Sequence, residues 1–393
     1  MNKLTVRDVE LKDKRVLVRV DFNVPQDEHL NITDDARIRA SIPTIKYILE
    51  KGAKKVILMS HLGRPKGKVK KEYRLNSVAK RLQELIGKPV KKLDDCIGDD
   101  IKRTIENSSE KLILLENLRF HPEEEENDTG FAEKLASLGE IFVNDAFGTA
   151  HRAHASTEGV THFLKSVAGF LIEKEIQYLG EALASPQHPF VVILGGSKVS
   201  DKIGVIENLL PKCDCLLIGG GMAYTFLSAR GLKIGNSKLE KDKIDLAKDI
   251  LEKAAKMNKQ VVLPIDHLVV SNLESDDKGT IVNQDIPNGK IAVDIGPETT
   301  KLFKDKLRSA KTVVWNGPLG IFEKEAFAHG TNQVAEFLAT LKATTIIGGG
   351  DTAAAIANID LTDKMTHIST GGGASLEFLE GKVLPGIAAL ASR

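Results

Sequence analysis

The sequence predicts an α/β protein whose parallel sheets are covered by helices on both faces. Short apolar runs alternate along almost the whole chain with longer segments of helical periodicity, the pattern of strands joined by helices. Several runs end in glycines or polar residues, at the edge where such sheets bind ligands. A length of 393 residues exceeds one ordinary core, so we expect about two or three domains.

The expected elements follow one another in a regular order. In the first half, apolar runs predict strands over Arg15–Val20, Lys55–Met59, Leu112–Leu115 and Ile141–Val143, and helices are expected over Ala36–Lys51 and Leu75–Ile86. In the second half, strands are expected over Phe190–Leu194, Cys215–Ile218, Gln260–Leu263, Thr312–Trp315, Thr344–Ile347 and Thr366–Ser369.

A domain boundary is expected near Phe170–Pro189. Apolar residues recur at roughly helical spacing over Leu171–Ala184, which predicts a helix. The segment Ser185–Pro189 then ends this helix, because its prolines cannot continue one. The acidic run Glu123–Asp128 is interpreted as a solvated loop.

Composition excludes several classes of protein. The net charge of +1 gives no general attraction to nucleic acid, so any basic site must be local. No apolar run approaches the roughly 18 residues of a membrane span, and the N-terminus lacks the apolar region of a secretory signal. Three cysteines cannot form a disulfide framework, which indicates a reducing compartment and thus the cytoplasm.

Glycine-rich turns follow four of the apolar runs. Triple glycines stand at Gly219–Gly221, Gly348–Gly350 and Gly371–Gly373, and Gly195-Gly196-Ser197-Lys198 has the same form with a lysine added. Glycine leaves backbone N–H groups uncovered at the start of the next helix, where phosphate binds well. Glycine also serves tight turns for structural reasons alone, but four such turns on one presumed sheet edge favour phosphate binding.

Basic and hydrogen-bonding groups collect at expected loop positions in the first half. They are Arg37, His61, Arg64, Arg119 and Arg152, with Asp21 and Asn23 placed to orient a hydroxyl or an arginine. Several converging arginines would hold a small, multiply charged anion, although any single arginine can also be a surface ion pair. A metal site built from His61, His151 and His154 is a weaker alternative, because no carboxylate stands at a recognisable ligand spacing.

The second half adds cations and a carboxylate to its glycine turns. Lys198 and Lys202, four residues apart, are expected on one face at the first turn of a helix, where the dipole disfavours cations unless an anion is bound. Asp351, after the second triple glycine, is either a Mg²⁺ ligand or a helix N-cap. The segment Trp315–Glu323 offers apolar groups to cover a base and a glutamate for ribose hydroxyls.

Two common nucleotide motifs do not explain the chain. No Walker-type G-x-x-x-x-G-K-[ST] sequence occurs. Gly348-x-Gly350-x-x-Ala353 fits a dinucleotide fingerprint, but the next expected strand ends in Ser369-Thr370 instead of the acid that binds a ribose. A nicotinamide-dependent dehydrogenase therefore remains only the alternative function.

The ordered motifs together resemble the phosphoglycerate kinases over essentially the whole chain. The segments that carry this resemblance are Val20–Pro25, His61–Pro65, Glu116–Phe120, His151–Ser156, Gly195–Lys202, Trp315–Pro318, Gly348–Thr352 and Gly371–Ser375. The resemblance implies reversible phosphoryl transfer from 1,3-bisphosphoglycerate to Mg-ADP, giving 3-phosphoglycerate and ATP in glycolysis.

The same resemblance implies a monomer of two Rossmann-like domains joined by a hinge helix. Residues 1–170 would bind the triose, 171–188 would form the linker, 189–375 would bind nucleotide, and 376–393 would return to the first domain. The triose would be held by Asp21, Asn23, Arg37, His61, Arg64, Arg119 and Arg152. The nucleotide would be held by Lys198, Lys202, Gly220, Glu323, Gly349, Gly350, Asp351 and Thr352, with Asp351 as the Mg²⁺ contact.

Phosphoryl transfer needs no side-chain nucleophile, so positioning and charge stabilisation should dominate. Arg37, Lys198, Lys202 and the N–H groups of Gly371, Gly372 and Gly373 are of the type that receives charge in the transition state. Hinge closure that expels water is expected before in-line transfer. A binding protein with a spent catalytic site is disfavoured by the retained Arg37, Lys198, Lys202 and Asp351, and Ala292 stands where many relatives have glycine.

Overall fold

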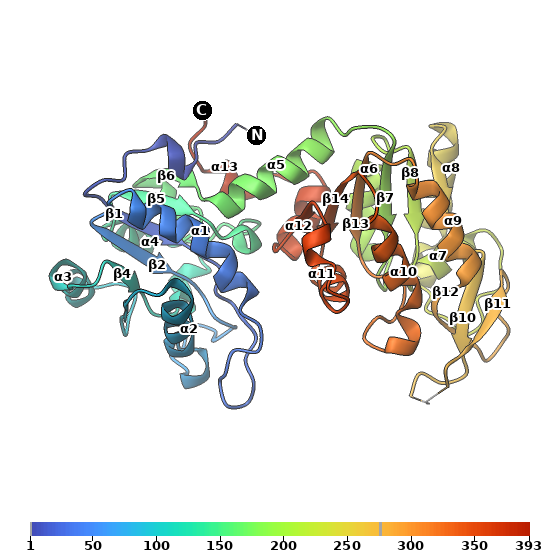
Figure 1. Ribbon diagram of the computed structural model, residues 1–393, viewed down its shortest axis with the longest axis horizontal. Coiled ribbons are helices and arrows are strands. Elements are labelled where there is room, and N and C mark those ends of the chain that lie inside the picture. Colours follow the sequence, from blue (N-terminus) through green and yellow to red (C-terminus); the bar gives the residue numbers. More distant parts are fainter. Residues whose placement is uncertain (1, 275–276) are drawn as a thin grey trace. The chain divides into compact units, whose positions relative to one another are not determined.

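The computed structural model describes residues 2–274 and 277–393 and divides into two compact units. The first unit comprises Met1–Gln177 and Val383–Arg393, and the second comprises Tyr178–Lys382. Helix α5 (Phe170–Ala184) contains the point where the chain passes from one unit to the other. Figure 1 shows a separate sheet in each unit. The domain limits inferred from the sequence, together with their ligands, stay a prediction.

The first unit is built on a six-stranded sheet in which all pairings are parallel. Its strand order is β3 (Val90–Lys92), β4 (Leu112–Leu114), β2 (Lys55–Met59), β1 (Arg15–Arg19), β5 (Ile141–Asn144) and β6 (Lys165–Ala168). Strand β2 is buried at every position, so both faces of the sheet are covered, as the sequence predicted. The short edge strands β3 and β6 lie outside the expected set, because neither has a long apolar run.

The helices of the first unit bury their apolar stripes against this sheet. They are α1 (Ala36–Glu50), α2 (Asn76–Ile86), α3 (Asp99–Asn107), α4 (Thr129–Ala136), the first part of α5, and α13 (Pro385–Ala388). Ile38, Ile45 and Ile48 of α1 pack with Val78 and Leu82 of α2 in one core that also holds strand residues. The spacing of these residues is helical, which explains why both segments were predictable.

The C-terminal segment of the chain belongs to the first unit. The N–H of Leu4 donates to the carbonyl of Ala391 (2.8 Å), and Nδ2 of Asn144 donates to the carbonyl of Gly386 (3.0 Å). The N- and C-terminal segments therefore lie side by side, as Figure 1 shows. Asn144 ends β5, so this contact fastens the returning segment to the carboxyl edge of the sheet.

The second unit contains another parallel six-stranded sheet. Its order is β15 (His367–Ile368), β14 (Thr344–Gly348), β13 (Thr312–Asn316), β7 (Phe190–Leu194), β8 (Cys215–Ile218) and β9 (Gln260–Val262). Its helices are α6 (Ile203–Leu209), α7 (Ala223–Ala229), α8 (Ile244–Lys256), α9 (Pro297–Leu307), α10 (His329–Leu338), α11 (Gly350–Ala357) and α12 (Gly373–Leu379). The predicted α/β class with parallel sheets is thus confirmed in both units.

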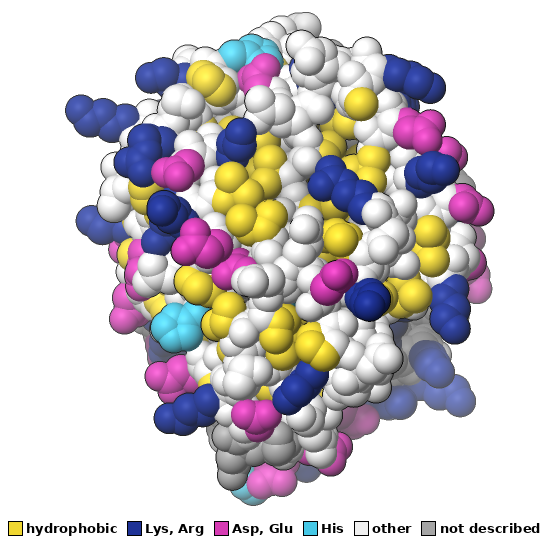
Figure 2. Space-filling view, turned by 90° about the vertical axis from the view of Figure 1, so that its right-hand side faces the viewer, with side chains coloured by type: hydrophobic (Ala, Val, Ile, Leu, Met, Phe, Trp, Pro, Cys, Tyr) yellow, Lys and Arg dark blue, Asp and Glu magenta, His cyan; other side chains and the backbone are white. Residues whose placement is uncertain are grey.

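A small antiparallel sheet in the second unit was not predicted. Its strands, in the order β11 (Thr280–Asn283), β10 (Asp266–Val270) and β12 (Ile291–Ile295), are paired antiparallel. Figure 2 views the side of the second unit that carries this sheet and shows hydrophobic side chains among charges of both signs. The edge strand β11 is mostly exposed, so its sequence has no apolar run from which a strand could be predicted. Within residues 2–274 and 277–393, the helices are too short or too polar to cross a bilayer.

Candidate functional site

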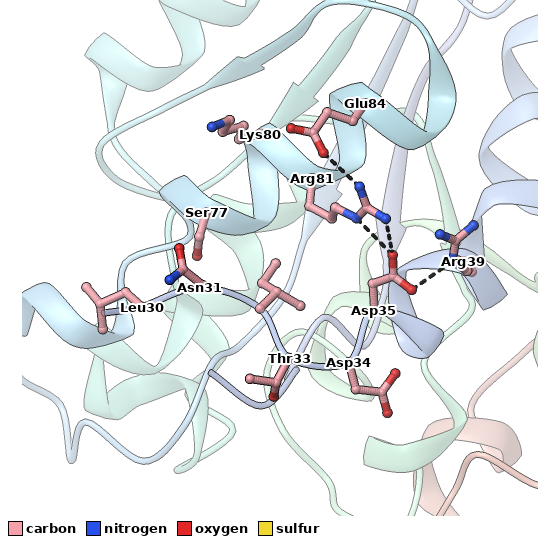
Figure 3. Close-up of a pocket in the computed structure, with 11 residues that line it drawn as sticks. Leu30, Asn31, Thr33, Asp34, Asp35, Arg39, Ser77, Lys80, Arg81 and Glu84 are labelled. Carbon is pink, nitrogen blue, oxygen red and sulfur yellow. Dashed lines mark hydrogen bonds and ion pairs between the residues drawn. The ribbon is translucent and has the colours of Figure 1, made fainter. Parts of the chain in front are cut away.

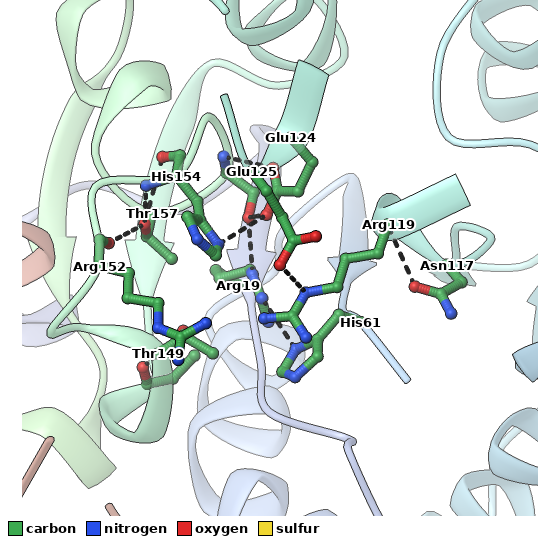
Figure 4. A network of polar contacts seen from close by, with 12 residues as sticks. Arg19, His61, Asn117, Arg119, Glu124, Glu125, Thr149, Arg152, His154 and Thr157 are labelled. Atoms are coloured by element: carbon green, nitrogen blue, oxygen red, sulfur yellow. Dashed lines mark hydrogen bonds and ion pairs between the residues drawn. The ribbon is translucent and has the colours of Figure 1, made fainter. Parts of the chain in front are cut away.

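A buried polar network lies at the carboxyl ends of the strands in the first unit (Figure 4). Arg19, the last residue of β1, is fully buried, and its Nε donates to Oγ of Ser156 (2.8 Å). Ser156 Oγ in turn donates to Oε1 of Glu124 (2.6 Å), and Nη2 of Arg19 lies 3.2 Å from Nδ1 of His61. The strand end therefore carries a cation that is held in place by hydrogen bonds.

Arg19, Glu124 and Ser156 were missed as members of the site. Arg19 was counted as part of an apolar strand, although a charge inside such a run was the available signal. The interpretation of Glu123–Asp128 as a solvated loop is wrong for Glu124, which is fully buried. Its carboxylate accepts from Ser156 and faces Arg19, so burial among cations, which the sequence does not reveal, overrides the polar pattern.

Four of the expected triose-binding residues are joined by hydrogen bonds or lie next to the network. Nη1 of Arg37, in the first turn of α1, donates to Oδ2 of Asp21 at 2.7 Å. Oδ1 of Asn23 accepts from the N–H of Gly63 (2.8 Å), whose carbonyl accepts from Nη1 of Arg119 (3.0 Å). Three loops after three different strands are thereby held at one edge of the sheet.

The electrostatics of this cluster favour an anion. Burial, and then the nearby charges of Arg19, Arg119 and Arg37, hold the pKa of His61 well below its usual value. Burial and the charges of Arg119, Arg19 and Arg152 lower the pKa of His154 to about 3. Both histidines are therefore neutral near pH 7 and leave the surrounding guanidinium groups to an anionic ligand.

The remaining expected residues of the first unit lie at the rim. Arg152 is exposed, but its charge helps to lower the pKa of both Arg119 and His154, so it belongs to the same electropositive region. Arg64 is exposed beside Gly63. Among the described residues, the groups positioned to bind a metal do not include His61, His151 or His154, which argues against the alternative of a metal site there.

A neighbouring hollow on the first unit provides a useful contrast (Figure 3). This space of about 570 Å³ is lined by residues 30–35 together with side chains of α1 and α2. Its two arginines, Arg39 and Arg81, both bind the carboxylate of Asp35, and Arg81 also pairs with Glu84 (2.8 Å). The hollow therefore lacks the concentration of positive charge found around His61.

In the second unit, hydrogen bonds join the turns that follow four adjacent strands. The N–H groups of Gly195, Gly196 and Gly220 donate to the carbonyls of Asn316 (3.0 Å), Pro318 (2.9 Å) and Leu319 (3.0 Å), respectively. The N–H of Gly317 donates to Oγ1 of Thr352 (2.7 Å), which is fully buried. These bonds fix the edge of the sheet as one continuous surface.

The glycines at this edge fall into two groups. Gly220 has φ +64°, and a Cβ there would lie 2.7 Å from backbone atoms of Gly196, so a neighbouring turn requires this glycine. A Cβ on Gly350 would meet nothing within 4 Å. Glycine at position 350 therefore leaves a space that the protein does not fill. The sequence alone cannot separate these two reasons for glycine.

The two lysines do not occupy the first turn of a helix, so that expectation is wrong. The chain forms a bend around Lys198, a 3₁₀ turn over Ser200–Lys202, and only then α6. The reason is a tertiary contact, because the carboxylate of Glu240 accepts from the N–H groups of Val199 and Ser200, as a side chain does at the start of a helical turn, and the turn therefore begins after Lys198. Glu240 was not recognised from the sequence.

Lys202 is the more enclosed of the two lysines. Its Nζ donates to Oδ1 of Asn316, and burial lowers its pKa, while the charges of Asp201 and Asp351 oppose that change. Nδ2 of Asn316 is also buried and has no hydrogen-bond acceptor among the described residues. An ammonium and an amide thus lie beside the glycine turns.

Asp351 does not cap its helix, so that alternative is excluded. The N-cap of α11 is Gly349, which has no side chain to accept from the first N–H groups of the helix. Asp351 lies in the first turn and is exposed, which leaves its carboxylate available to a cation. In the segment Trp315–Glu323, Trp315 is fully buried and donates to the carbonyl of Gly317 (2.8 Å), so it is not available to cover a base. Ile321 and Phe322 are half-buried and Glu323 is exposed, and their contact with a nucleotide stays a prediction.

The fold and these two edges define an α/β protein with a guanidinium-rich anion site in one unit and a glycine-lined edge in the other. A family model described as phosphoglycerate kinase matches residues 6–382. The phosphoglycerate kinases of Moorella thermoacetica and Dictyoglomus turgidum are 56% and 58% identical, each over at least 98% of both chains.

Solved structures give the same result. The phosphoglycerate kinase of Coxiella burnetii has a TM-score of 0.89 and 43% identity, and that of Pyrococcus horikoshii has 0.84 and 34%, each covering 98% of both chains. This chain belongs to the phosphoglycerate kinase family. It is accordingly a phosphotransferase of the class whose acceptor is a carboxyl group, and the comparisons give the dehydrogenase alternative no support.

Proposed function

We propose that this chain transfers a phosphoryl group reversibly from 1,3-bisphosphoglycerate to Mg-ADP, giving 3-phosphoglycerate and ATP. The observation that supports these substrates best is that one unit has a guanidinium-rich cluster, while the other has a glycine edge that carries Lys202 and Asp351. A small, multiply charged triose phosphate suits the guanidinium groups of the first unit, and a nucleoside diphosphate suits the glycine edge of the second unit.

The triose is assigned to the first unit. Arg119, Arg152 and His61 line the region of highest positive charge and would hold the phosphate that is not transferred. Asp21 and Asn23 would take the hydroxyl, and Asp21 also orients Arg37 through its hydrogen bond. Arg64 completes the rim.

The nucleotide is assigned to the second unit, at Gly220, Glu323 and the start of α11. The space above Gly350 and the free N–H groups of the first turn suit phosphate oxygens, since a helix N-terminus attracts anions. Asp351 would hold Mg²⁺, which binds through one or two carboxylates and the phosphate oxygens of its nucleotide. The magnesium supplies charge neutralisation of the phosphate oxygens when it is bound.

In the transfer step, an ADP β-phosphate oxygen forms a bond to the phosphorus of the acyl phosphate as the bond to the carboxylate oxygen breaks. The acceptor becomes ATP and the leaving group is a carboxylate, so no proton must be moved by a side chain. Arg37, Lys198, Lys202 and the N–H groups of Gly371–Gly373 would stabilise the charge on the transferring oxygens. In the structure the N–H of Gly371 donates to Oγ of Ser369 (3.2 Å), so this donor would have to exchange the hydroxyl for a transferring oxygen.

The two ligands are assigned to different units, so we propose that hinge closure precedes transfer. Neither ligand alone should close the molecule fully, since a ligand shifts an equilibrium only through its different affinities for the two states. Small-angle scattering of the free, singly bound and ternary forms tests this. Full contraction with nucleotide alone would contradict it.

We further propose that the enzyme acts as a monomer in the cytoplasm. The three cysteines, Cys96, Cys213 and Cys215, are free thiols buried in the structure, which suits a reducing compartment. Sedimentation at micromolar concentration measures the oligomeric state, and a stable dimer would contradict the monomer.

The decisive experiment is a coupled assay of ATP formation from enzymatically generated 1,3-bisphosphoglycerate and Mg-ADP. The proposal requires saturable ATP formation that stops when the triose, ADP or Mg²⁺ is omitted. Nicotinamide-dependent turnover without the coupling enzyme, or binding of both ligands without turnover, would support the dehydrogenase or the spent binding protein instead.

A further inference from the structure

Three side chains of different chemistry meet behind the anion site of the first unit. Asp95 and Cys96 lie in the loop that follows β3, and His121 follows the 3₁₀ turn Leu118–Phe120 that carries Arg119. A carboxylate oxygen, the thiol sulfur and an imidazole nitrogen of these residues all lie within 4.8 Å of one another. Among the described residues, these three are the histidine, cysteine and acidic side chains that lie close enough together to hold a metal ion.

An ordinary hydrogen bond accounts for part of this arrangement. Nε2 of His121 lies 2.7 Å from Oδ1 of Asp95, which also accepts from the N–H of Cys96 (2.7 Å). A histidine–carboxylate pair of this kind occurs elsewhere in the unit, where Nε2 of His162 lies 2.8 Å from Oε1 of Glu158, and among the described residues no cysteine joins that pair in a possible metal-binding group. The buried thiol is what distinguishes the first pair.

A second acidic group adds to the cluster. The charge of Glu123 reaches His121 and helps to raise its pKa, after the larger effect of the hydrogen bond to Asp95. Oε2 of Glu123 is shielded from solvent and has no hydrogen-bond donor among the described residues. A shielded carboxylate oxygen without a donor, two residues after a histidine of the His–Asp–Cys group, is a group that a cation would satisfy, although Glu123 lies outside the set of atoms within 4.8 Å of one another.

Access to the group comes from one side. Cys96 is completely buried, whereas the side chain of Asp95 is 51% exposed and that of His121 is 25% exposed. An ion would therefore meet the carboxylate first, then the imidazole, and reach the thiol last. This order gives a cation an entry path, which a fully enclosed group would not provide.

We propose that Asp95, Cys96 and His121 form a binding site for Zn²⁺ or a similar borderline-soft divalent cation. The donor set contains one sulfur, one nitrogen and one oxygen, which suits Zn²⁺ and excludes Mg²⁺ and Ca²⁺, ions that prefer oxygen alone. Three protein ligands leave one position of a tetrahedral ion for water or for the nearby Glu123.

Binding exchanges protons for the metal and breaks no other covalent bond. The thiol of Cys96 gives up its S–H proton to solvent as the S–Zn bond forms, since thiolate is the ligand. Burial and the neighbouring charges of Asp95 and Glu124 keep that thiol protonated in the metal-free protein. Each ion bound at neutral pH therefore releases a proton from the thiol.

The site would act on the substrate loop without touching substrate. One residue, Phe120, separates His121 from Arg119, whose guanidinium donates to the carbonyl of Gly63 in the anion site. An ion that ties His121 to the loop after β3 would restrain the segment carrying Arg119. The metal would thus be structural, separate from the magnesium that accompanies the nucleotide.

Cobalt titration of the full-length protein, stripped of metal with a chelator and kept reduced, tests the site. A Co²⁺–thiolate bond gives a charge-transfer band in the near ultraviolet, and we expect this band to saturate at one equivalent and to disappear when Zn²⁺ is added. Metal analysis after gel filtration should then give one Zn²⁺ per chain. None of these readouts depends on activity.

Variants identify the ligands. Cys96→Ser should abolish the thiolate band, and His121→Gln should weaken Co²⁺ binding at least about tenfold, since loss of even an outer partner costs that much. Glu123→Gln should weaken it less. The matched controls, Cys213→Ser and His162→Gln, remove a buried thiol and a paired histidine elsewhere and should leave both band and affinity unchanged.

Two results would overturn the proposal. One is the absence of a thiolate band in the wild-type protein at millimolar Co²⁺. The other is a band that persists in Cys96→Ser and disappears in Cys213→Ser, which would move the bound metal to another thiol. If Cys96→Ser does not fold, the solvent-accessible Asp95→Asn decides, because unchanged Co²⁺ affinity in that variant would equally contradict the site.

Discussion

The two units, to which we assign different phosphate-bearing ligands, form their candidate binding edges in different ways. The first unit concentrates charged side chains, and it buries Arg19 and Glu124 beneath the surface to hold others in place. The second unit presents glycine turns whose backbone groups are joined to one another, with few charges among them. Each charged side chain of the first unit can be substituted singly, whereas the backbone surface of the second unit forms only when all of its turns fit together.

The difference has an energetic consequence. Buried charges are costly unless they are paired, so the first unit depends on matched partners. Close approach of backbones requires the missing Cβ, so the second unit depends on glycine where turns touch. Mutations should therefore damage the first unit through unpaired charge and the second through steric conflict.

Removing the buried partner of Arg19 should have the largest effect. In Glu124→Ala both donors of Ser156 lose their acceptor and the buried guanidinium of Arg19 loses a nearby opposite charge, and we expect a loss of about 3–5 kcal/mol in the free energy of unfolding. Denaturant unfolding measures this. Glu126→Ala, at an exposed position of the same acidic run, should change stability by less than about 0.5 kcal/mol. Equal effects would show that Glu124 does not stabilise Arg19.

Arg37→Ala should lower kcat by about 10²-fold or more while the fold persists, by analogy with loss of one charge-stabilising donor. Arg39→Ala is the matched control, because Arg39 lies on the same helix and pairs with Asp35 outside the anion site. Steady-state kinetics of both variants are required. If Arg37→Ala raised only the KM for the triose, Arg37 would bind substrate without stabilising the transition state.

Asp351→Asn should weaken Mg-nucleotide by about tenfold and metal-free nucleotide much less, because a neutral amide is a poor magnesium ligand. Calorimetric titrations with and without Mg²⁺ make the comparison. Asp201→Asn removes another carboxylate whose charge reaches Lys202, and it should affect both titrations alike. The same loss in both titrations of Asp351→Asn would rule out a magnesium contact.

Two glycine variants should separate packing from ligand binding in the second unit. Gly220→Ala forces φ +64° on alanine against the backbone of Gly196, and we expect it to destabilise the protein by about 1 kcal/mol or more. Gly350→Ala should keep or raise stability, since alanine is the better helix former by about 1 kcal/mol, while it weakens nucleotide binding.

Thermal unfolding and nucleotide titration of both glycine variants provide the test. Gly231→Ala gives the control for backbone strain alone, because φ is +80° there and a Cβ would meet nothing within 4 Å. Unchanged nucleotide affinity in Gly350→Ala would mean that the space above position 350 does not hold the ligand.

Most of the fold was predictable from local patterns. Fully buried parallel strands such as β2 and β7 are continuous apolar runs, and α1, α2 and α5 carry helical stripes, so burial is written directly into their sequences. Among the strands that escaped prediction, β3, β6 and β11 are short or lie at an edge, and their sequences have no long apolar run. Strands β10 and β12 escaped as well, although most of their residues are buried or half-buried.

The candidate site was predictable where residue types were unusual for their position. Glycine triplets after strands, Arg37, Arg119 and Asp351 stand out as polar or flexible groups at expected strand ends. Arg19, Glu124 and Glu240 were missed, because each acts through a partner distant in sequence, although the charge of Arg19 inside an apolar run was a usable signal.

The sequence by itself therefore determined the α/β class, the ends of the strands and the residue types collected there. Tertiary structure alone decided that Glu124 is buried, that Lys198 lies outside a helix, and that Gly220 serves packing while Gly350 leaves open space. The physical reason is the separation in sequence between the residues that interact. Periodicity reports which face of an element is buried, whereas ion pairs and close backbone contacts depend on residues that only folding brings together.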